Sequence, residues 1–383
     1  MYDKTDLMTH PPIQPLTTDP ETSPTLPGWA YTDPVLFERE KHEIFFKSWL
    51  YAGWIGDLRE PGDYLTAEIL GQKIAIVRGT DGTLRGFHNV CRHRAHHLLT
   101  GCGRASAIVC PYHAWTYGTD GRLRSARGLE QRPGFDPAQF TLRSIRVELL
   151  CGKLVFFNLD AEAPPFSQFS AGLEDELRTE IADFDGMERV ERQPAGDGRI
   201  PPANAIIKAN WKIVMDNCLE CYHCRPVHPS FRQLMHMEQF KVRAHDYWAT
   251  LKGEPANPGL IPASARNKTY RFWWLWPNTF IEMMPGGAHG FTIGSQVPID
   301  IAQTGTARTD RFGLPGEPLF EPRGYGDLNL APEDREAMEA VQNNIESLGY
   351  GQGRFSYDPE HGETSEEAVH RFQWLVASAL GLV

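Results

Sequence analysis

The sequence predicts an α+β protein with an all-β N-terminal domain and a C-terminal domain in which long helices pack on an antiparallel sheet. Short strand-like runs with tight turns fill residues 47–163, and Pro164-Pro165 marks a boundary. Beyond it, strand-like runs alternate with helical patterns. The 383 residues also suit two domains. We expect an N-terminal arm and helix over residues 1–46, packed on the C-terminal domain, the β domain over 47–163 and the helix–sheet domain over 164–383.

The N-terminal segment is predicted to be a loosely ordered arm followed by one helix. Residues 1–26 are rich in Thr, Pro and Asp. Asp33 can cap a helix that begins at Pro34, which suits the first helical position, and runs to Trp49. The chain start lacks the basic and apolar regions of a secretory signal, and no apolar run of about 18 residues occurs. We therefore expect a cytoplasmic protein without a membrane span.

The order of the elements follows from turn signals and periodicity. Asp81-Gly82 and Asp120-Gly121 are hairpin signals. In the β domain, strands are expected at 64–70, 73–78, 84–89, 108–109, 115–117 and 149–159, the last broken by Gly152. In the second domain, helices are expected at 174–184, 210–222, 333–348 and 365–380, with strands at 205–210, 271–284 and 290–298.

Charge and cysteine content narrow the function classes. The 49 acidic and 38 basic residues give a net charge of −11, which disfavours a nucleic-acid partner and suits a cationic partner or substrate. The seven cysteines are an odd number in a chain without a secretory signal, which argues against a disulfide framework. We expect them to be metal ligands or buried thiols.

Two loops of the β domain contain the pairs Cys91-x-His93 and Cys110-x-x-His113. Two thiolates on one iron and two imidazoles on the other make a Rieske [2Fe–2S] cluster. A zinc site is the alternative, but zinc fingers usually pair Cys with Cys and His with His. We predict the cluster. Three neighbouring residues are expected to pack beside it without binding it: His96, His97 and Cys102.

A second group of ligands follows in the helix–sheet domain, where a predicted helix ends in His223 and a second histidine, His228, follows. Asp216, Glu220 and His223 are spaced four and three apart, so they would share one helix face, and Asp216 is a candidate catalytic residue. Pro226 stops the helix, so that the chain can turn His228 toward His223. Two imidazoles and a carboxylate form the facial triad of non-heme Fe(II) oxygenases. The alternative is a hydrogen-bonded histidine pair.

The third iron ligand has to come from elsewhere in the chain. We choose Asp334, at the start of the helix predicted at 333–348, with Glu333 as the fallback. Either could instead be a carboxylate that interacts with the helix dipole. Three cysteines near the histidines resemble part of a ferredoxin cluster motif but lack a fourth, and helical spacing turns them apart. We expect small buried residues near the iron at these positions: Cys218, Cys221 and Cys224.

The chain resembles the oxygenase (α) component of the Rieske non-heme iron oxygenases from about Tyr31 to its C-terminus. The resemblance lies in the segments 89–94, 110–115 and 210–228. Within that family, Glu220-Cys221-Tyr222-His223-Cys224 and the C-terminal Gly349-Tyr350 and Gly353-Arg354-Phe355 are similar to the branch that acts on quaternary ammonium compounds. That branch includes carnitine and choline monooxygenases and the glycine betaine and stachydrine demethylases.

The resemblance implies a helix-grip catalytic domain with a mononuclear Fe(II), and O₂ as co-substrate. A separate flavin- or ferredoxin-type reductase would supply electrons from NAD(P)H. It also implies a homotrimer in which the cluster of one subunit serves the iron of the next. His113 would hydrogen-bond Glu220 across that interface, and Glu220 would touch His223. A carboxylate between two imidazoles would fix both tautomers and shorten the electron path.

The substrate is harder to infer from the residues. The segment 271–278 is dense in aromatic residues, which attract quaternary ammonium groups. Because side chains alternate along a strand, either the even-numbered or the odd-numbered residues face the pocket. Packing in the core is the alternative for each of them. Our candidate substrate-binding residues are Trp274, Trp276 and Phe291, followed by Met283, Met284 and His289.

The expected reaction is hydroxylation or oxidative N-demethylation of a small quaternary ammonium compound. Three alternatives stay open: a ring-hydroxylating oxygenase that acts on an aromatic acid, a plain Rieske electron carrier, and a non-enzymatic helix-grip binding protein. The roughly 220 residues after the β domain, with their own metal triad, speak against the electron carrier.

Overall fold

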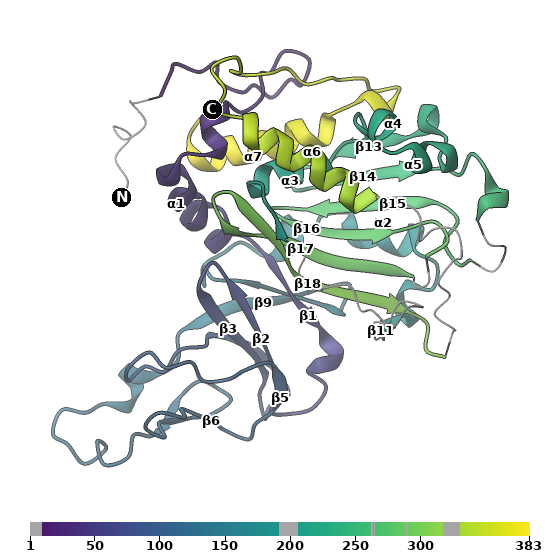
Figure 1. Cartoon of the computed structure of the whole chain (residues 1–383). Coiled ribbons are helices and arrows are strands. Elements are labelled where there is room, and N and C mark those ends of the chain that lie inside the picture. Colours follow the sequence, from purple (N-terminus) through teal and green to yellow (C-terminus); the bar gives the residue numbers. More distant parts are fainter. Residues whose placement is uncertain (1–9, 191–205, 262, 264, 288–289, 317–329) are drawn as a thin grey trace. The chain divides into compact units, whose positions relative to one another are not determined.

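The computed structural model describes residues 10–190, 206–261, 263, 265–287, 290–316 and 330–383 (Figure 1). The chain divides into two compact units. One comprises Phe45–Gln168, and the other comprises Met1–Ile44 together with Phe169–Val383. The first is built of strands and the second of helices and an antiparallel sheet, which confirms the predicted α+β class.

The unit of residues 45–168 contains two antiparallel sheets. The larger has the order β1-β10-β9-β4-β3-β2-β5, and the smaller has the order β6-β7-β8. The strands are β1 (Leu50–Trp54), β2 (Asp63–Ile69), β3 (Gln72–Arg78), β4 (Leu84–His88), β5 (Cys102–Arg104), β6 (Ile108–Val109), β7 (Thr116–Tyr117), β8 (Leu123–Ser125), β9 (Ser144–Leu150) and β10 (Leu154–Asn158). The run predicted at 149–159 is divided between β9 and β10, because Cys151 and Gly152 turn the chain with φ values of 52° and 68°.

The second unit is built around an eight-stranded sheet with the order β11-β18-β17-β16-β15-β14-β13, in which β12 also pairs with β18. The strands are β11 (Glu188–Val190), β12 (Ile206–Ile207), β13 (Lys241–Ala244), β14 (Trp248–Gly253), β15 (Tyr270–Leu275), β16 (Thr279–Met283), β17 (Phe291–Asp300) and β18 (Gln303–Gly313). The single strand predicted at 271–284 is therefore wrong. Pro277, which has no backbone N–H, and Asn278 form a turn between β15 and β16.

Seven helices accompany this sheet among the described residues: α1 (Pro34–Glu43), α2 (Leu173–Glu180), α3 (Trp211–Cys218), α4 (Cys224–Val227), α5 (Pro229–Leu234), α6 (Leu330–Asn344) and α7 (Glu367–Leu380). Asp33 caps α1 as predicted, accepting from the backbone N–H of Val35 at 2.7 Å. Within the described part of the chain, no helix has the length and apolar character needed to cross a membrane.

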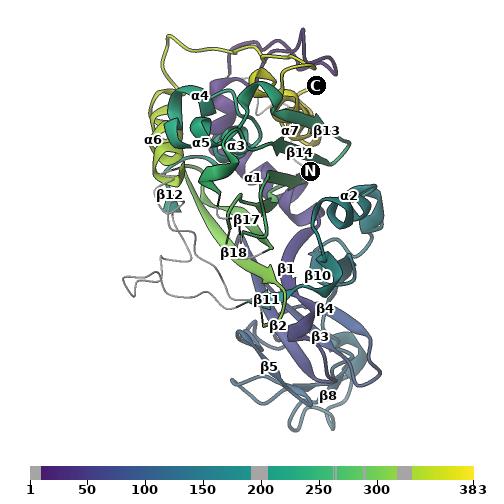
Figure 2. The ribbon, with the colours of Figure 1, turned by 90° about the vertical axis from the view of Figure 1, so that its right-hand side faces the viewer.

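The strand register assigns the side chains to two faces of the sheet. Leu251, Phe272 and Glu282 are paired neighbours on β14, β15 and β16, so they share one face. Lys252 and Arg271 are on the other face, where both bind Glu180 of α2 at 2.7 Å. Figure 2 shows α2 and α6 on opposite sides of the strands.

Helices α3 and α7 pack on the same face as Phe272. The ring of Phe372 on α7 lies 5.7 Å from that of Trp274 on β15 and 5.4 Å from that of Trp211 on α3. All three side chains are fully buried. The packed side chains between the helices and this face of the sheet therefore form one boundary of a space beside Phe272 that they do not fill.

Helix α3 ends earlier than predicted, at Cys218 and not near Tyr222. Beyond it, the carboxylate of Glu220 accepts from the backbone N–H of His223 at 3.0 Å. A side chain that takes a backbone donor in this way competes with the helical hydrogen bond. The predicted helix face shared by Asp216, Glu220 and His223 is therefore wrong, because only Asp216 lies on α3.

Candidate functional site

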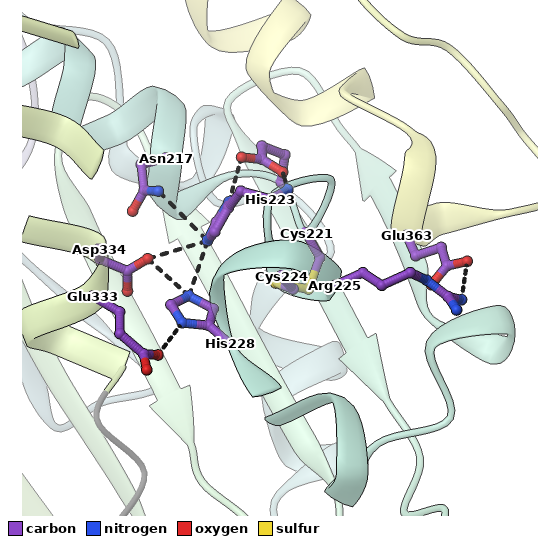
Figure 3. Close-up of a disulfide and its surroundings, with 10 residues drawn as sticks. Asn217, Cys221, His223, Cys224, Arg225, His228, Glu333, Asp334 and Glu363 are labelled. Carbon is purple, nitrogen blue, oxygen red and sulfur yellow. Dashed lines mark hydrogen bonds and ion pairs between the residues drawn. A yellow bond between two sulfur atoms is a disulfide. The ribbon is translucent and has the colours of Figure 1, made fainter. Parts of the chain in front are cut away.

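Three potential metal ligands meet at the edge of the helix–sheet unit (Figure 3). Nε2 of His223 lies 3.2 Å from Nε2 of His228 and 3.1 Å from Oδ1 of Asp334. Nε2 of His228 lies 2.9 Å from the same oxygen. Ligand atoms about 2.1 Å from an ion and at right angles to one another are about 3 Å apart. The three atoms are thus spaced like one face of an octahedron around a single ion.

Each imidazole is held from behind by a carboxylate. Nδ1 of His223 bonds Oε1 of Glu220 at 2.5 Å, and Nδ1 of His228 bonds Oε2 of Glu333 at 2.7 Å. Carboxylates on the distal nitrogens fix the tautomer, so that both Nε2 atoms present a lone pair to the same point. The positions of the two carboxylates therefore differ: Asp334 lies on the ligand face, and Glu333 orients His228.

The electrostatics of this group favour a cation at its centre. Burial lowers the pKa of His223, but hydrogen bonds with Asp334 and Glu220 outweigh it and raise that pKa to about 9. Burial raises the pKa of Asp334, but its bonds to the two histidines outweigh it and lower that pKa to about 2. The ligand face thus combines a negatively charged carboxylate with two imidazoles, and the whole group favours a positive charge at its centre. A divalent metal ion supplies that charge.

A disulfide shapes the turn that carries His223. Cys221 and Cys224 are joined, with Cα atoms 4.8 Å apart, and His223 lies between them in the sequence (Figure 3). The prediction that both are free buried thiols is wrong, because the end of α3 lets the chain turn and brings two residues three apart within disulfide distance. Cys218, at the end of α3, has a free thiol that faces the cavity described next.

A cavity of about 270 Å³ opens directly from the ligand face. His223, His228 and Asp334 form one end, and the sheet face that carries Phe272 forms another side. None of the described residues that line it is a lysine or an arginine. Its aromatic walls are Phe231, Phe240, Tyr270, Phe272 and Phe280, and its other sheet residues are Leu251, Glu282 and Gln296.

The candidate substrate-binding aromatics lie elsewhere, so that prediction is corrected. Trp274 shares the face of Phe272 but packs on Phe372 and donates its indole N–H to the carbonyl of Pro277 at 3.0 Å. Trp276 also packs on Phe372. Phe291 is fully buried between other aromatic rings. Alternation along β15 was read correctly, but the sequence could not show where α7 covers the face.

Two of the lower-ranked pocket candidates do not line the cavity either. Met283 is paired with Arg271 and shares its face, opposite the cavity. Met284 follows β16 and is absent from the cavity wall. His289 lies outside the described residues. Four of the five aromatic wall residues were missed because they stand outside the aromatic-rich segment 271–278: Phe231, Phe240, Tyr270 and Phe280.

Glu220 and His223 also line a hollow of about 500 Å³ on the outer side of the ligand group. Tyr222 and Arg225 flank it, and Tyr222 is 54% exposed. Arg225 is held there by Glu363, at 2.7 Å. Glu220 thus bonds His223, a candidate iron ligand, and also borders a hollow at the surface.

Asp216, on α3, belongs to a buried polar group and is absent from the cavity wall. The hydroxyl of Tyr31 donates to it at 2.8 Å. Burial raises the pKa of Asp216 to about 7. The structure therefore places this catalytic candidate away from the cavity wall.

This placement predicts a pH-dependent effect of Asp216→Asn. A carboxyl group whose pKa is higher in the folded than in the unfolded state stabilises the fold at low pH, and that stability is lost as pH rises through about 7. The metal-loaded variant should therefore lose less thermal stability than the parent between pH 5 and pH 8, with kcat retained. Loss of turnover with unchanged unfolding temperatures would instead indicate a direct catalytic role.

In the β unit, the two predicted cluster loops share one backbone arrangement. Ala95 and Ala114 donate their N–H groups to the carbonyls of Cys91 and Cys110, at 3.1 and 3.0 Å. Both alanines have positive φ values, 58° and 57°. Residues other than glycine adopt this conformation at a cost of about 1–3 kcal/mol, and such strain collects at functional sites.

The side chains of these loops turn toward one another above a buried core. The rings of His93 and His113 have centroids 4.8 Å apart, and His93 stacks on Trp115. Burial raises the pKa of Cys110, while backbone N–H groups of Tyr112 and His113 act against this and favour its thiolate. Cys91 is also buried, with its sulfur 3.3 Å from the hydroxyl of Tyr117.

These residues fit a two-iron cluster better than a single ion. Among the described residues, the one group of three or more His, Cys, Asp or Glu side chains that is placed to hold a metal ion consists of His223, His228 and Asp334. The four loop ligands therefore do not converge on one point, as they would around zinc. Nδ1 of His113 is buried without a hydrogen-bond partner, as expected of a nitrogen reserved for a metal.

A β unit with such loops and a helix–sheet unit with a facial triad, in one chain, define the class of Rieske non-heme iron oxygenases. Family comparison agrees: residues 48–143 match the Rieske [2Fe-2S] domain, and residues 182–293 match the catalytic domain of the ring hydroxylating alpha subunit.

Comparison with individual proteins narrows the class. The chain is 34% identical to the carnitine monooxygenase oxygenase subunit of Acinetobacter pittii, over 94% of this chain and 95% of the relative. It is also 34% identical to that of Escherichia coli K12, over 94% of each. A solved quaternary ammonium Rieske monooxygenase, described with carnitine oxidation and inter-subunit electron transfer, superposes with a TM-score of 0.81 at 31% identity, over 96% of this chain and all of that one.

The chain belongs to the family of Rieske non-heme iron monooxygenases, as an oxygenase subunit. It is an oxidoreductase whose cofactors are a Rieske [2Fe–2S] cluster and a mononuclear iron, with O₂ as co-substrate and electrons from NAD(P)H through a reductase. The predicted class and cofactors are confirmed.

Proposed function

We propose that this oxygenase hydroxylates or oxidatively N-demethylates a small quaternary ammonium compound. The observation that carries the proposal is the cavity beside the ligand face. Five of its described lining residues are aromatic, and none of the described lining residues is a lysine or an arginine. Aromatic faces attract quaternary ammonium groups, most strongly where water is excluded. The similarity to carnitine monooxygenase oxygenase subunits over 94% of the chain supports the same substrate class.

We assign His223, His228 and Asp334 as ligands of the mononuclear iron, and Cys91, His93, Cys110 and His113 as ligands of the cluster. The spacing of the first group and the free Nδ1 of His113 support this assignment. The corresponding domain limits are 47–163 for the cluster domain and 164–383 for the catalytic domain, with 1–46 as an arm and helix packed on the latter. A cytoplasmic location stays a prediction from the sequence.

Iron held by His223, His228 and Asp334 would supply O₂ activation with electrons from the cluster, and a substrate C–H bond would be hydroxylated. If that carbon is an N-methyl group, formaldehyde and the demethylated amine would be released. The chain's own groups prepare this. Glu220 and Glu333 hold the two imidazoles in one tautomer. The walls around Tyr270 and Phe272 exclude water and orient the substrate nitrogen.

Electrons are proposed to enter through Glu220. The hollow beside this residue could receive His113 of a neighbouring subunit, so that Glu220 bridges His113 and His223. The inter-subunit electron transfer described for the similar solved monooxygenase supports this, and a homotrimer is the assembly we propose. The partner would be a flavin- or ferredoxin-type reductase.

A substrate panel tests the proposed function. The metal-loaded protein with a generic reductase should consume O₂ and release formaldehyde or a cleaved amine with at least one of carnitine, γ-butyrobetaine, glycine betaine or choline. The control is the same mixture without substrate, which measures uncoupled O₂ use. Turnover of an aromatic acid with no response to any ammonium compound would instead establish the ring-hydroxylating alternative.

A further inference from the structure

Glu282 places a carboxylate in the wall of the active-site cavity. It lies on β16 beside Phe272 of β15, and both line the cavity. The residue is half-buried and lines the cavity, so its exposed part borders that space. The carboxylate therefore faces the substrate space.

This carboxylate has no partner within the described part of the protein. No hydrogen bond or ion pair among these residues involves it, although buried carboxylates are normally paired. Arg311 on β18 is aligned with Glu282 across the sheet, with one strand between them, so their backbones are about 10 Å apart. The two side chains form no ion pair with each other. Burial first, and then the negative charge of Asp334, raise the pKa of Glu282 to about 7, and Arg311 offsets part of this rise.

We propose that Glu282 is the counter-ion of the substrate's cationic nitrogen and the residue that selects ammonium compounds over neutral ones of the same shape. This inference rests on the proposed function and names a residue for it. The nitrogen would sit between Glu282 and the rings of Tyr270, Phe272 and Phe280, with an N-methyl group directed toward the ligand face. Glu282 and Asp334 line the same cavity, as this arrangement requires.

The aromatic walls alone would not give the same selectivity. Rings accept a tert-butyl group almost as well as a trimethylammonium group in shape, so hydrophobic contact does not separate them. A carboxylate left without a partner when a neutral molecule binds is penalised, whereas a cation satisfies it. A charge in the wall therefore adds to the attraction of the rings for a cation, and Glu282 is the carboxylate among the described lining residues that is not bonded to a histidine.

The test compares an ammonium compound with its neutral isostere in the parent protein and in Glu282→Gln. The pair consists of whichever of choline, glycine betaine or γ-butyrobetaine turns over fastest, and the tert-butyl compound in which carbon replaces nitrogen. Dissociation constants come from calorimetry of the metal-loaded, oxidised protein, and kcat/KM from product release. Glu336→Gln is the matched control, since it removes the same charge from an exposed position on α6.

In the parent protein we expect the cation to bind at least about 100-fold more tightly than its isostere, and Glu282→Gln to reduce this ratio at least about tenfold, or about 1.4 kcal/mol. Iron content and the cluster spectrum should not change, which shows that the variant is folded. An unchanged ratio in Glu282→Gln would overturn the inference while the proposed function stands. If the parent binds no ammonium compound but turns over an aromatic acid, the proposed function itself fails and the inference with it.

Discussion

Asp334→Ala is expected to lose the mononuclear iron and all substrate-dependent turnover while retaining the Rieske cluster. Asp334 supplies the only carboxylate oxygen of the ligand face, 2.9 Å and 3.1 Å from the two Nε2 atoms. Without it, two imidazoles alone would have to hold the ion, and a divalent iron site with neutral ligands only is weak. The iron content per chain should fall by the amount that the mononuclear site binds, and the visible spectrum of the cluster should not change.

The neighbouring glutamate provides a matched comparison. Glu333→Gln keeps the side-chain size and removes the charge that orients His228. A change in an outer partner of a metal ligand typically costs about 10–100-fold in metal affinity or activity, so this variant should bind iron weakly and be rescued by added Fe(II). Metal analysis of both variants decides the assignment: full iron in Asp334→Ala with loss in Glu333→Gln would exchange the two roles.

Glu220→Gln is expected to slow electron transfer while both metal centres remain. Glu220 bonds Nδ1 of His223 and borders the outer hollow, so it occupies the proposed path from a neighbour's His113. A glutamine keeps the shape but weakens the charge-assisted bonds to both rings. We expect kcat to fall by about 10–100-fold or more, with iron content and substrate affinity within a factor of about two.

The measurement that isolates this step is the rate at which O₂ and substrate reoxidise the pre-reduced cluster. In the parent protein the cluster should be oxidised in one fast phase, and in Glu220→Gln in a slow one. Glu336→Gln, on the exposed side of α6, is the control and should behave like the parent. Equal reoxidation rates in all three would show that the electron path avoids Glu220.

The candidate metal ligands could be chosen from the sequence because their residue types stand at short, characteristic spacings. Cys91-x-His93 with Cys110-x-x-His113, and the His223 and His228 pair, need only local loops or turns to become sites. Asp334 could be chosen but not separated from Glu333 until the orientation of α6 was known. The disulfide between Cys221 and Cys224 was missed because the predicted helix continued through them, whereas α3 ends at Cys218.

The substrate cavity depended on packing that no local pattern contains. Alternation along β15 could place Phe272 and Trp274 on one face, but only the position of Phe372 on α7 decides that Trp274 is covered. Glu282 carried no signal as one acidic residue in a strand. Its significance comes from the register that sets it beside Phe272 and from the lack of a partner among the described residues.

The most direct test of the account is a single turnover of the pre-reduced, metal-loaded protein without reductase. The protein is mixed with O₂ and the preferred ammonium compound, and cluster oxidation and product are measured in the same sample. We expect the cluster to be oxidised only when substrate is present, and product to form in proportion to the mononuclear iron and to disappear in Asp334→Ala. Cluster oxidation at the same rate without substrate, or product formed equally by Asp334→Ala, would contradict it.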